Sequence, residues 1–551
     1  MSISELLPAT KNPRKWRFTW ESNSHVPIIR LYLFQPNTKP SSQCTDLKVT
    51  VLSDKSLLEV TWLDKNQVGS PATAALLWVP IPRVLIDVDS PINLRALDDH
   101  IEVKFVLILP VDHPIISKFD FEAGDENALE DDELQPLQLD SDLKKLASCG
   151  EVQFYCRCCS TKLTRAVQFF KEMPSVNWRE AADNWFGTCC CSFGGVSEKL
   201  VAKYANSYTC SSGMCLVDAT SIVISKDDLI GHKFPNQIKL QEHKSLHSLN
   251  NSFKKLNVDH GSQNEKLHDH ECCHVHEHEE ETLDTNELLA NKTSLLNGLL
   301  GNSFMVTSPY LSKDIKWSEI SCPNCSCLLG AFPHDNLDGF PLNDSVHLFK
   351  CFISTSLPIG GSNDLFRKYS LERMFSSQLL ESAKDELSFR TVVRNLQTRS
   401  PMLQIVLINP NSWCSFGDCM DEMVSIPKIN IYPMIKVLFS DCSNNTESQL
   451  RKLDEWVKKN QVEDVYMLMT KALAESLELA NRMLPLSHAS LQGLSLSFLH
   501  SILPLTLIPV RAATLKSRLQ LQSMFLPINS NKDVKKRKVM QTWHMNTWSI
   551  K

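Results

Sequence analysis

Two pairs of cysteines in this chain each place two thiols three positions apart. The pairs are Cys156 with Cys159 and Cys322 with Cys325. This spacing is typical of a zinc knuckle, and two knuckles together supply the four thiolates of a tetrahedral structural zinc site. Zinc binding of this kind contributes roughly 10–16 kcal/mol in small metal-folded peptides, which is enough to hold together distant segments of a chain. We therefore predict one structural Zn²⁺ ion bound by these four thiolates.

Two other interpretations of the cysteine pairs stay open on the sequence alone. The pairs can be separate sets of buried thiols, or one pair can be redox-active. A redox-active pair usually lies in a βαβ context, which neither pair has. Cys158 and Cys327 are additional thiols beside the pairs, and either can replace a neighbouring ligand if the register of its knuckle shifts.

Between the two pairs lie Trp185 and a run of three cysteines, Cys189, Cys190 and Cys191. Alternate side chains of a strand point to opposite faces, so three adjacent thiols cannot readily bind one metal ion from a strand. We expect one of them to pack inward or to complete the knuckle site. Another is expected to face outward, where a thiolate can attack a thioester or bind a partner's metal. The alternative is that all three are buried small residues.

The composition of the chain argues against several classes of protein. A net charge of −6 gives no general reason to expect direct nucleic-acid binding. Residues 1–21 lack the apolar segment of a signal peptide, and prolines interrupt the apolar stretch at 494–510, so we expect neither secretion nor a membrane span. Without a secretory route the 19 cysteines should be mostly reduced. We therefore expect a cytoplasmic or nuclear protein.

Hydrophobic periodicity indicates how the chain is folded. Alternation of apolar and polar residues predicts strands in the N-terminal part, at 47–51, 58–62 and 101–105. Further strands are predicted at 216–217, 222–224, 402–408 and 435–439, and helices at 371–380, 450–457 and 465–484. We predict an α+β protein with a β-rich N-terminal half, a zinc-knuckle centre, an α+β C-terminal domain and a long disordered insertion.

The domain boundaries that we predict follow the changes in this pattern. They are a β-rich region at 1–119, an acidic linker at 120–143, the first knuckle with the cysteine run at 144–225, a disordered histidine-rich insertion at 226–312, the second knuckle at 313–345, the α+β domain at 346–527 and a basic tail at 528–551.

The insertion and the tail each allow two interpretations. Residues 268–278 alternate histidines with other residues, and such imidazoles can bind zinc, copper or nickel. The other interpretation is a disordered insertion without fixed metal geometry. The basic residues 535–538 are similar to a nuclear-import patch, but a solvated tail is at least as good an interpretation.

Taken together, these motifs resemble the HECT-like ubiquitin-conjugating-enzyme-binding family of ubiquitin-protein ligases. The similarity covers about residues 10–527 apart from the linker and the insertion. It rests on Phe154, Tyr155, Cys156 and Cys159; on Asn177, Trp178, Trp185 and the cysteine run; on residues 214–218; on Cys322, Cys325, Leu328 and Gly330; and on the pattern of segments at 366–526.

The resemblance implies an enzyme, a ubiquitin-protein transferase that binds a charged ubiquitin-conjugating enzyme and passes ubiquitin to a substrate lysine. A HECT-type mechanism needs a thiolate that takes ubiquitin as a thioester and then yields it to an amine. HECT ligases keep that cysteine near their C-terminal end, but the last cysteine here is Cys442. The first candidate nucleophile is Cys190, and Cys414 and Cys419, around a predicted Ser-Phe-Gly-Asp loop, are the second candidates. If no thioester forms, the protein acts as an adaptor for the charged enzyme.

The resemblance also implies an alternative function in messenger-RNA 3′-end processing. In this alternative the protein is a non-catalytic binding protein that inserts Trp185 and the run Cys189, Cys190 and Cys191 into the dinuclear zinc site of the cleavage endonuclease. Three residues separate Trp185 from the run, whereas other members keep the cysteine nearly adjacent to the tryptophan. Cys190 is the expected metal-reaching residue.

Overall fold

The structure is a computed structural model of the chain. It describes residues 15–52, 56–65, 73–116, 137, 139–173, 210–232, 234, 303–308, 311, 315–334, 345–385, 387–420 and 428–501. The chain divides into two compact units, Met1–Leu503 and Pro504–Lys551, and all described residues belong to the first. The histidine tract at 268–278 and the basic residues 535–538 lie outside the described residues, so both interpretations of each stay predictions.

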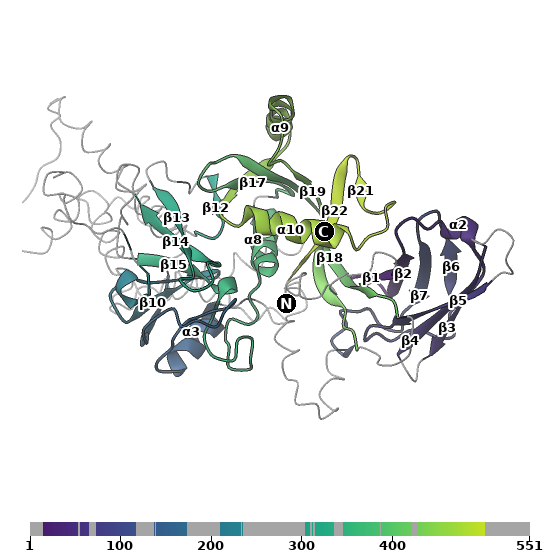
Figure 1. Cartoon of the computed structure of the whole chain (residues 1–551), viewed down its shortest axis with the longest axis horizontal. Coiled ribbons are helices and arrows are strands. Elements are labelled where there is room, and N and C mark those ends of the chain that lie inside the picture. Colours follow the sequence, from purple (N-terminus) through teal and green to yellow (C-terminus); the bar gives the residue numbers. More distant parts are fainter. Residues whose placement is uncertain are drawn as a thin grey trace, which may run out of the picture. The chain divides into compact units, whose positions relative to one another are not determined.

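The described part of the chain is mostly β-structure and contains five α-helices (Figure 1). The helices are α2 (Pro40–Gln43), α3 (Leu139–Ser148), α8 (Leu371–Asp385), α9 (Glu447–Lys459) and α10 (Thr470–Asn481). The predicted α+β class is confirmed only in part, because the described residues are mostly β-structure with five helices. None of these helices has the length and the apolar character that crossing a membrane requires.

An 11-stranded sheet joins strands from both ends of the described chain. Its main path is β12 (Val306–Thr307), β20 (Val462–Met467), β17 (Arg390–Asn395), β18 (Pro401–Asp418), β1 (Arg17–Asn23), β2 (Ile28–Phe34), β7 (Ile101–Val106) and β6 (Asn93–Ala96). Off this path, β19 (Tyr432–Asp441) pairs with β18 and with β22 (Leu494–His500), which also pairs with β21 (Ser490–Leu491). The antiparallel pairing of β1 with β18 places Trp20 opposite Ser415. Residues from the regions predicted at 1–119 and 346–527 therefore share one sheet, and the boundaries themselves stay predictions.

The N-terminal strands form a hydrophobic core with a second, three-stranded sheet. That sheet consists of β3 (Cys44–Leu52), β4 (Leu57–Asp64) and β5 (Thr73–Pro80). The strands predicted at 47–51, 58–62 and 101–105 are confirmed as parts of β3, β4 and β7; half-buried residues alternate with exposed ones along β3, and buried residues with half-buried ones along β7. Trp20 is fully buried in this core, and its indole Nε1 donates a hydrogen bond to the Pro80 oxygen at 3.0 Å.

A six-stranded sheet carries the second cysteine pair. Its order is β13 (Lys316–Ser321), β14 (Leu328–His334), β15 (Ser345–Phe349), β11 (Ser221–Ser225), β10 (Met214–Val217) and β9 (Phe169–Glu172). Cys322 and Cys325 lie in the turn that joins β13 to β14. The first pair begins with Cys156, the last residue of the short strand β8 (Tyr155–Cys156), which pairs with β16 (Ile353–Ser354). The strands predicted at 216–217 and 222–224 are confirmed as parts of β10 and β11.

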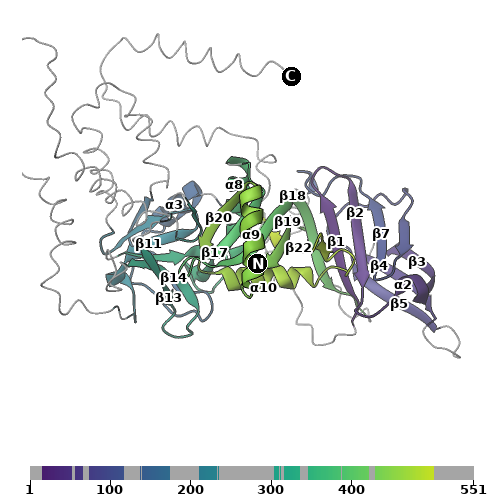
Figure 2. The same cartoon turned by 90° about the horizontal axis from the view of Figure 1, so that it is seen from above.

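Helices α8 and α10 pack against β22, and α10 also contacts β17 and β18 (Figure 2). The helices predicted at 371–380 and 450–457 are confirmed as parts of α8 and α9, and α9 begins with a capping box between Thr446 and Gln449. The prediction of one helix over 465–484 is wrong at its start, because Val465 and Met467 belong to β20, which pairs in parallel with β17. Both side chains are buried, and their spacing of two residues is that of one face of a strand.

Gly330 in β14 provides a test of the strand pairing in the six-stranded sheet. A Cβ atom there would lie 1.9 Å from the backbone oxygen of His347 on β15. We expect Gly330→Ala to lower the free energy of unfolding by about 3 kcal/mol or more in urea titrations, because two paired strands must move apart. Gly213→Ala is the control: its φ of 80° is strained, but nothing lies within 4 Å of the new Cβ. It should cost only about 1–2 kcal/mol, and equal losses for the two variants would contradict the close approach.

Candidate metal centre

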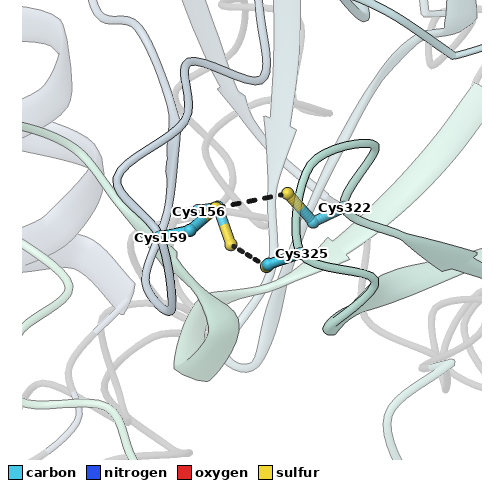
Figure 3. A group of neighbouring side chains, drawn as sticks. All are labelled: Cys156, Cys159, Cys322 and Cys325. Atoms are coloured by element: carbon cyan, nitrogen blue, oxygen red, sulfur yellow. Dashed lines mark hydrogen bonds between the residues drawn. The ribbon is translucent and has the colours of Figure 1, made fainter.

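The four predicted ligand thiols come together, although they belong to turns far apart in the chain. The Sγ atoms of Cys156, Cys159, Cys322 and Cys325 all lie within 4.8 Å of one another. Figure 3 shows the two pairs facing each other, with Cys156 and Cys325 sulfur atoms 3.7 Å apart and those of Cys159 and Cys322 3.6 Å apart. All four cysteines are free, so these contacts are not disulfides.

The spacing of the sulfur atoms fits a zinc ion. A tetrahedral ion with Zn–S bonds of about 2.3 Å places its ligands about 3.8 Å apart, close to the two sulfur–sulfur distances of 3.7 and 3.6 Å. Four sulfur donors in this arrangement favour zinc among the divalent metals, because thiolates are soft ligands. The cluster can therefore hold a metal ion, and its donor set points to zinc.

The two knuckles have the same backbone hydrogen bonds. In the first, the Ser160 nitrogen donates to the Cys156 oxygen at 2.9 Å, and the Cys156 nitrogen donates to the Thr161 oxygen at 2.8 Å. In the second, the equivalent bonds run from Ser326 to Cys322 at 2.9 Å and from Cys322 to Cys327 at 2.8 Å. Each turn closes on itself in the same way, and this fixes the direction of both thiols in each pair.

The residue after each pair has a left-handed backbone. Ser160 has a φ of 60° and Ser326 a φ of 61°. Glycine adopts this conformation at no steric cost, whereas serine carries a Cβ that crowds the backbone. Both turns are therefore strained at the same position. The interactions that close the site must offset the free-energy cost of this strain.

The ligand thiols differ in their tendency to ionise. Burial raises the pKa of the Cys156 and Cys322 thiols above the ordinary value. The pKa of Cys159 is lowered to about 6, first by its side-chain hydrogen bond with the Thr161 hydroxyl and then by a hydrogen bond with the Thr161 backbone. Metal binding requires all four thiols to be deprotonated. A bound cation stabilises the negative charge of the buried thiolates, which burial alone disfavours.

Arg157, between two ligand positions, anchors the first knuckle to the chain that leads into α8. Its guanidinium donates hydrogen bonds to the backbone oxygens of Tyr369 and Phe366, each at 2.6 Å. A third bond reaches the Ile353 oxygen at 3.3 Å. A single arginine within a knuckle carries no signal in the sequence of what it will bind, so this role of Arg157 was not predictable.

Helix α3 is tied to the same segment by a buried ion cluster. The carboxylate of Asp142 accepts hydrogen bonds from Lys350 Nζ at 3.0 Å and from Lys368 Nζ at 2.7 Å. Tyr369 also donates its hydroxyl to Asp142. Burial lowers the pKa of Lys350, and the nearby carboxylate opposes this shift. The cluster and Arg157 together fix the position of residues 366–369 relative to the first knuckle.

The other predicted site residues are not part of this cluster. Trp185, Cys189, Cys190 and Cys191 lie outside the described residues, so their roles stay predictions. Cys414 is fully buried, and this burial raises its pKa well above the ordinary value of a thiol. The expected Ser-Phe-Gly-Asp loop beside it is wrong, because these residues belong to β18 and pair with β1 on one side. A buried, protonated thiol within a sheet is a poor nucleophile.

The sequence model of the family described as "HECT-like Ubiquitin-conjugating enzyme (E2)-binding" matches residues 29–260 and 262–496. The matched residues include both knuckles and most of the large sheet, and they make up well over half of the chain. The chain therefore belongs to this family. Neither the curated proteins nor the solved structures gave a match.

Removal of single ligands tests the metal centre. We expect the purified protein to carry zinc at about one ion per chain by elemental analysis, and Cys156→Ser or Cys322→Ser to lose most of it, because three thiolates hold structural zinc poorly. Cys149→Ser is the matched control, since Cys149 is an exposed thiol outside the cluster, and it should keep its zinc. A wild-type protein without stoichiometric metal would refute the assignment.

The strained serines give a second test. Ser160→Gly and Ser326→Gly should each raise the free energy of unfolding by about 1 kcal/mol, because glycine relieves the left-handed strain. Ser326→Ala keeps a Cβ at the same position and should give no such gain. The comparison is made by urea unfolding of the zinc-loaded protein, and destabilisation by both glycine variants would mean that the serine side chains have another role.

Proposed function

We propose that this protein binds a ubiquitin-conjugating enzyme charged with ubiquitin and promotes transfer of the ubiquitin to lysines of substrate proteins. The observation that carries this proposal is the family match over residues 29–260 and 262–496. The match extends across strands of all four sheets of the described residues and across the cysteine cluster, so it concerns the folded protein and not one short motif.

The metal centre has a structural role in this proposal. Four cysteine ligands complete the tetrahedral sphere of zinc and leave no open position for substrate or water. Bound zinc would supply only a fixed link between the two hairpins. The chain's own residues then keep the first knuckle in place, through the bonds from Arg157 to the segment before α8.

The proposal also concerns the chemical route of ubiquitin, that is, whether it forms a thioester on this chain and on which cysteine. A thioester on this chain needs a thiol that the conjugating enzyme can reach and that ionises readily. Cys414 is fully buried and its pKa is raised, which does not favour it as the acceptor. We therefore propose Cys190 as the acceptor, and direct transfer from the positioned conjugating enzyme as the alternative route.

A discharge assay tests both the promotion of ubiquitin transfer and the thioester on Cys190. The full-length protein is mixed with a conjugating enzyme carrying labelled ubiquitin, and the products are separated on non-reducing and reducing gels. We expect faster loss of the charged enzyme and a thiol-sensitive ubiquitin adduct on this protein. Cys190→Ala should abolish the adduct, whereas Cys414→Ala, provided that it keeps its zinc and fold, should retain it.

The outcomes distinguish the proposed thioester on Cys190 from the proposed function as a whole. Faster discharge without any adduct, or normal ubiquitination by Cys190→Ala, would overturn the thioester on Cys190 and favour the adaptor route. No binding and no change in discharge with any conjugating enzyme tested would overturn the proposed function itself.

A further inference from the structure

A second group of titratable side chains, outside the metal centre, joins the two ends of the described chain. Asp99 and His100 lie in the connection between β6 and β7, and Ser487 and His488 lie in the turn at 486–488 between α10 and β21. The Ser487 nitrogen donates a hydrogen bond to one oxygen of the Asp99 carboxylate at 2.6 Å, and the Ser487 hydroxyl donates to the other at 3.0 Å. One carboxylate, 388 positions earlier in the chain, therefore holds this turn.

The rings of both histidines pack where the two segments meet. The centroids of the His100 and His488 rings lie 4.9 Å apart, with the ring planes at 74°. The Tyr32 ring of β2 contacts both, at 4.9 Å from His488 and 5.6 Å from His100. Tyr32 and His100 are buried, and His488 is half-buried. The contact between the turn and β2 is thus made by rings that can change their charge.

Asp99 also orients the His100 ring. The Nδ1 atom of His100 donates to the Asp99 carboxylate at 2.7 Å. The other ring nitrogen, Nε2, is buried and has no hydrogen-bond partner among the described residues. A proton added there would be a buried N–H group without an acceptor, which is costly. The geometry around His100 therefore leaves no place for a second proton on this ring.

His488 is the group through which pH acts on the contact. Burial, and then the nearby His100 ring, lower the pKa of His488 below its ordinary value of 6.5. Glu21 of β1 and Lys436 of β19 affect this pKa in opposite directions, and they pair with each other at 2.7 Å. Asp99 acts in the same direction as Glu21 and has a smaller effect than the other groups. Protonation of His488 is therefore disfavoured while the turn lies against Tyr32.

The other charged groups around the contact have a different chemistry. Glu21, Arg30 and Glu102 act on the Tyr32 phenol, and the last two lie 3.8 Å apart. Burial acts to raise the pKa of Asp99, but the hydrogen bonds from Ser487 and His100 outweigh burial and the pKa is lowered. Carboxylates and guanidinium groups generally keep their charge between pH 5 and 8, where imidazoles titrate.

We propose that Tyr32, Asp99, His100, Ser487 and His488 form a pH-responsive latch. With neutral histidines, Asp99 and the ring contacts hold the turn at 486–488 on β2. A proton on His488 places a cation against the His100 ring, and the turn leaves Tyr32, which becomes exposed. Removal of the proton lets the turn return.

The direction of the pH dependence follows from the two histidine states. The pKa of His488 is lower in the closed latch than in the open one, so the open form binds more protons. The closed form is therefore fully stable above the ordinary pKa of 6.5 and weakens as the pH falls below it. The lowered pKa of Asp99 stabilises the closed form above 3.8, and that contribution is lost only at still lower pH.

Amide hydrogen exchange of the full-length, zinc-loaded protein tests the latch, because the Ser487 amide donates to Asp99. After correction for the intrinsic pH dependence of exchange, the protection of peptides covering 483–491 should fall by up to about tenfold between about pH 7.5 and about pH 5.5. It should return when the pH is raised again. Asp99→Ala should lower the protection at both pH values, since Ser487 loses its acceptor.

Variants of single histidines assign the response. His488→Phe keeps a ring against Tyr32 without a titratable nitrogen, so it should keep its protection at both pH values. If this variant does not fold, His488→Tyr takes its place with the same expectation. His25→Gln is the matched control: it removes a histidine that pairs with Asp112 at 2.9 Å, and it should respond to pH as the wild type does.

Three results would overturn the proposal. They are equal protection of the wild-type turn at both pH values, the same loss of protection in the ring variant of His488, and a parallel loss of protection in β14, which would mean that acid unfolds the protein. The proposal depends neither on the transfer of ubiquitin nor on the metal assignment, and a failed discharge assay would leave it intact.

Discussion

The closure of two hairpins over four sulfur atoms is the constraint on which the centre of this protein depends. Cys156 and Cys159 come from a hairpin next to the two-stranded sheet, and Cys322 and Cys325 from a hairpin of the six-stranded sheet. Backbone hydrogen bonds shape each turn but do not hold the two turns together. Four thiols within 4.8 Å of one another, two of them buried with raised pKa values, make a stable arrangement when a cation replaces their protons.

The closure matters because the first knuckle is also tied to other parts of the fold. Arg157 extends from the knuckle to the backbone of residues 366–369, and the carboxylate of Asp142 binds Lys350 and Lys368 around the same segment. A buried cluster of this kind is strongly destabilised when one partner is lost, because a charge is left unpaired. The metal centre, the arginine and the ion cluster thus act on one segment, which leads directly into α8.

The sequence predicted the ligand set because metal chemistry is local: a pair of thiols three residues apart is visible without knowledge of the fold. Strands with strict alternation, such as β3 and β7, were predictable for the same reason. The pairing of β1 with β18 was not, since no local pattern records which distant strand will be the neighbour. The predicted helix at 465–484 begins too early: Val465 and Met467, two residues apart as on one face of a strand, belong to β20, which pairs with β17. The left-handed backbone at Ser160 and Ser326 was predictable, because each serine stands at a position of a tight turn where glycine is usual.

The burial of Cys414 bears on how a HECT-like chain can act. A thioester relay needs a mobile, accessible thiolate, and Cys414 lies on a strand that is paired on both sides. Exposing its thiol would require breaking the sheet that joins the N-terminal and C-terminal strands, which costs far more than a loop movement. An acceptor for ubiquitin needs a backbone that can present its thiol, and the run that contains Cys190 is followed, after Ser192 and Phe193, by Gly194 and Gly195.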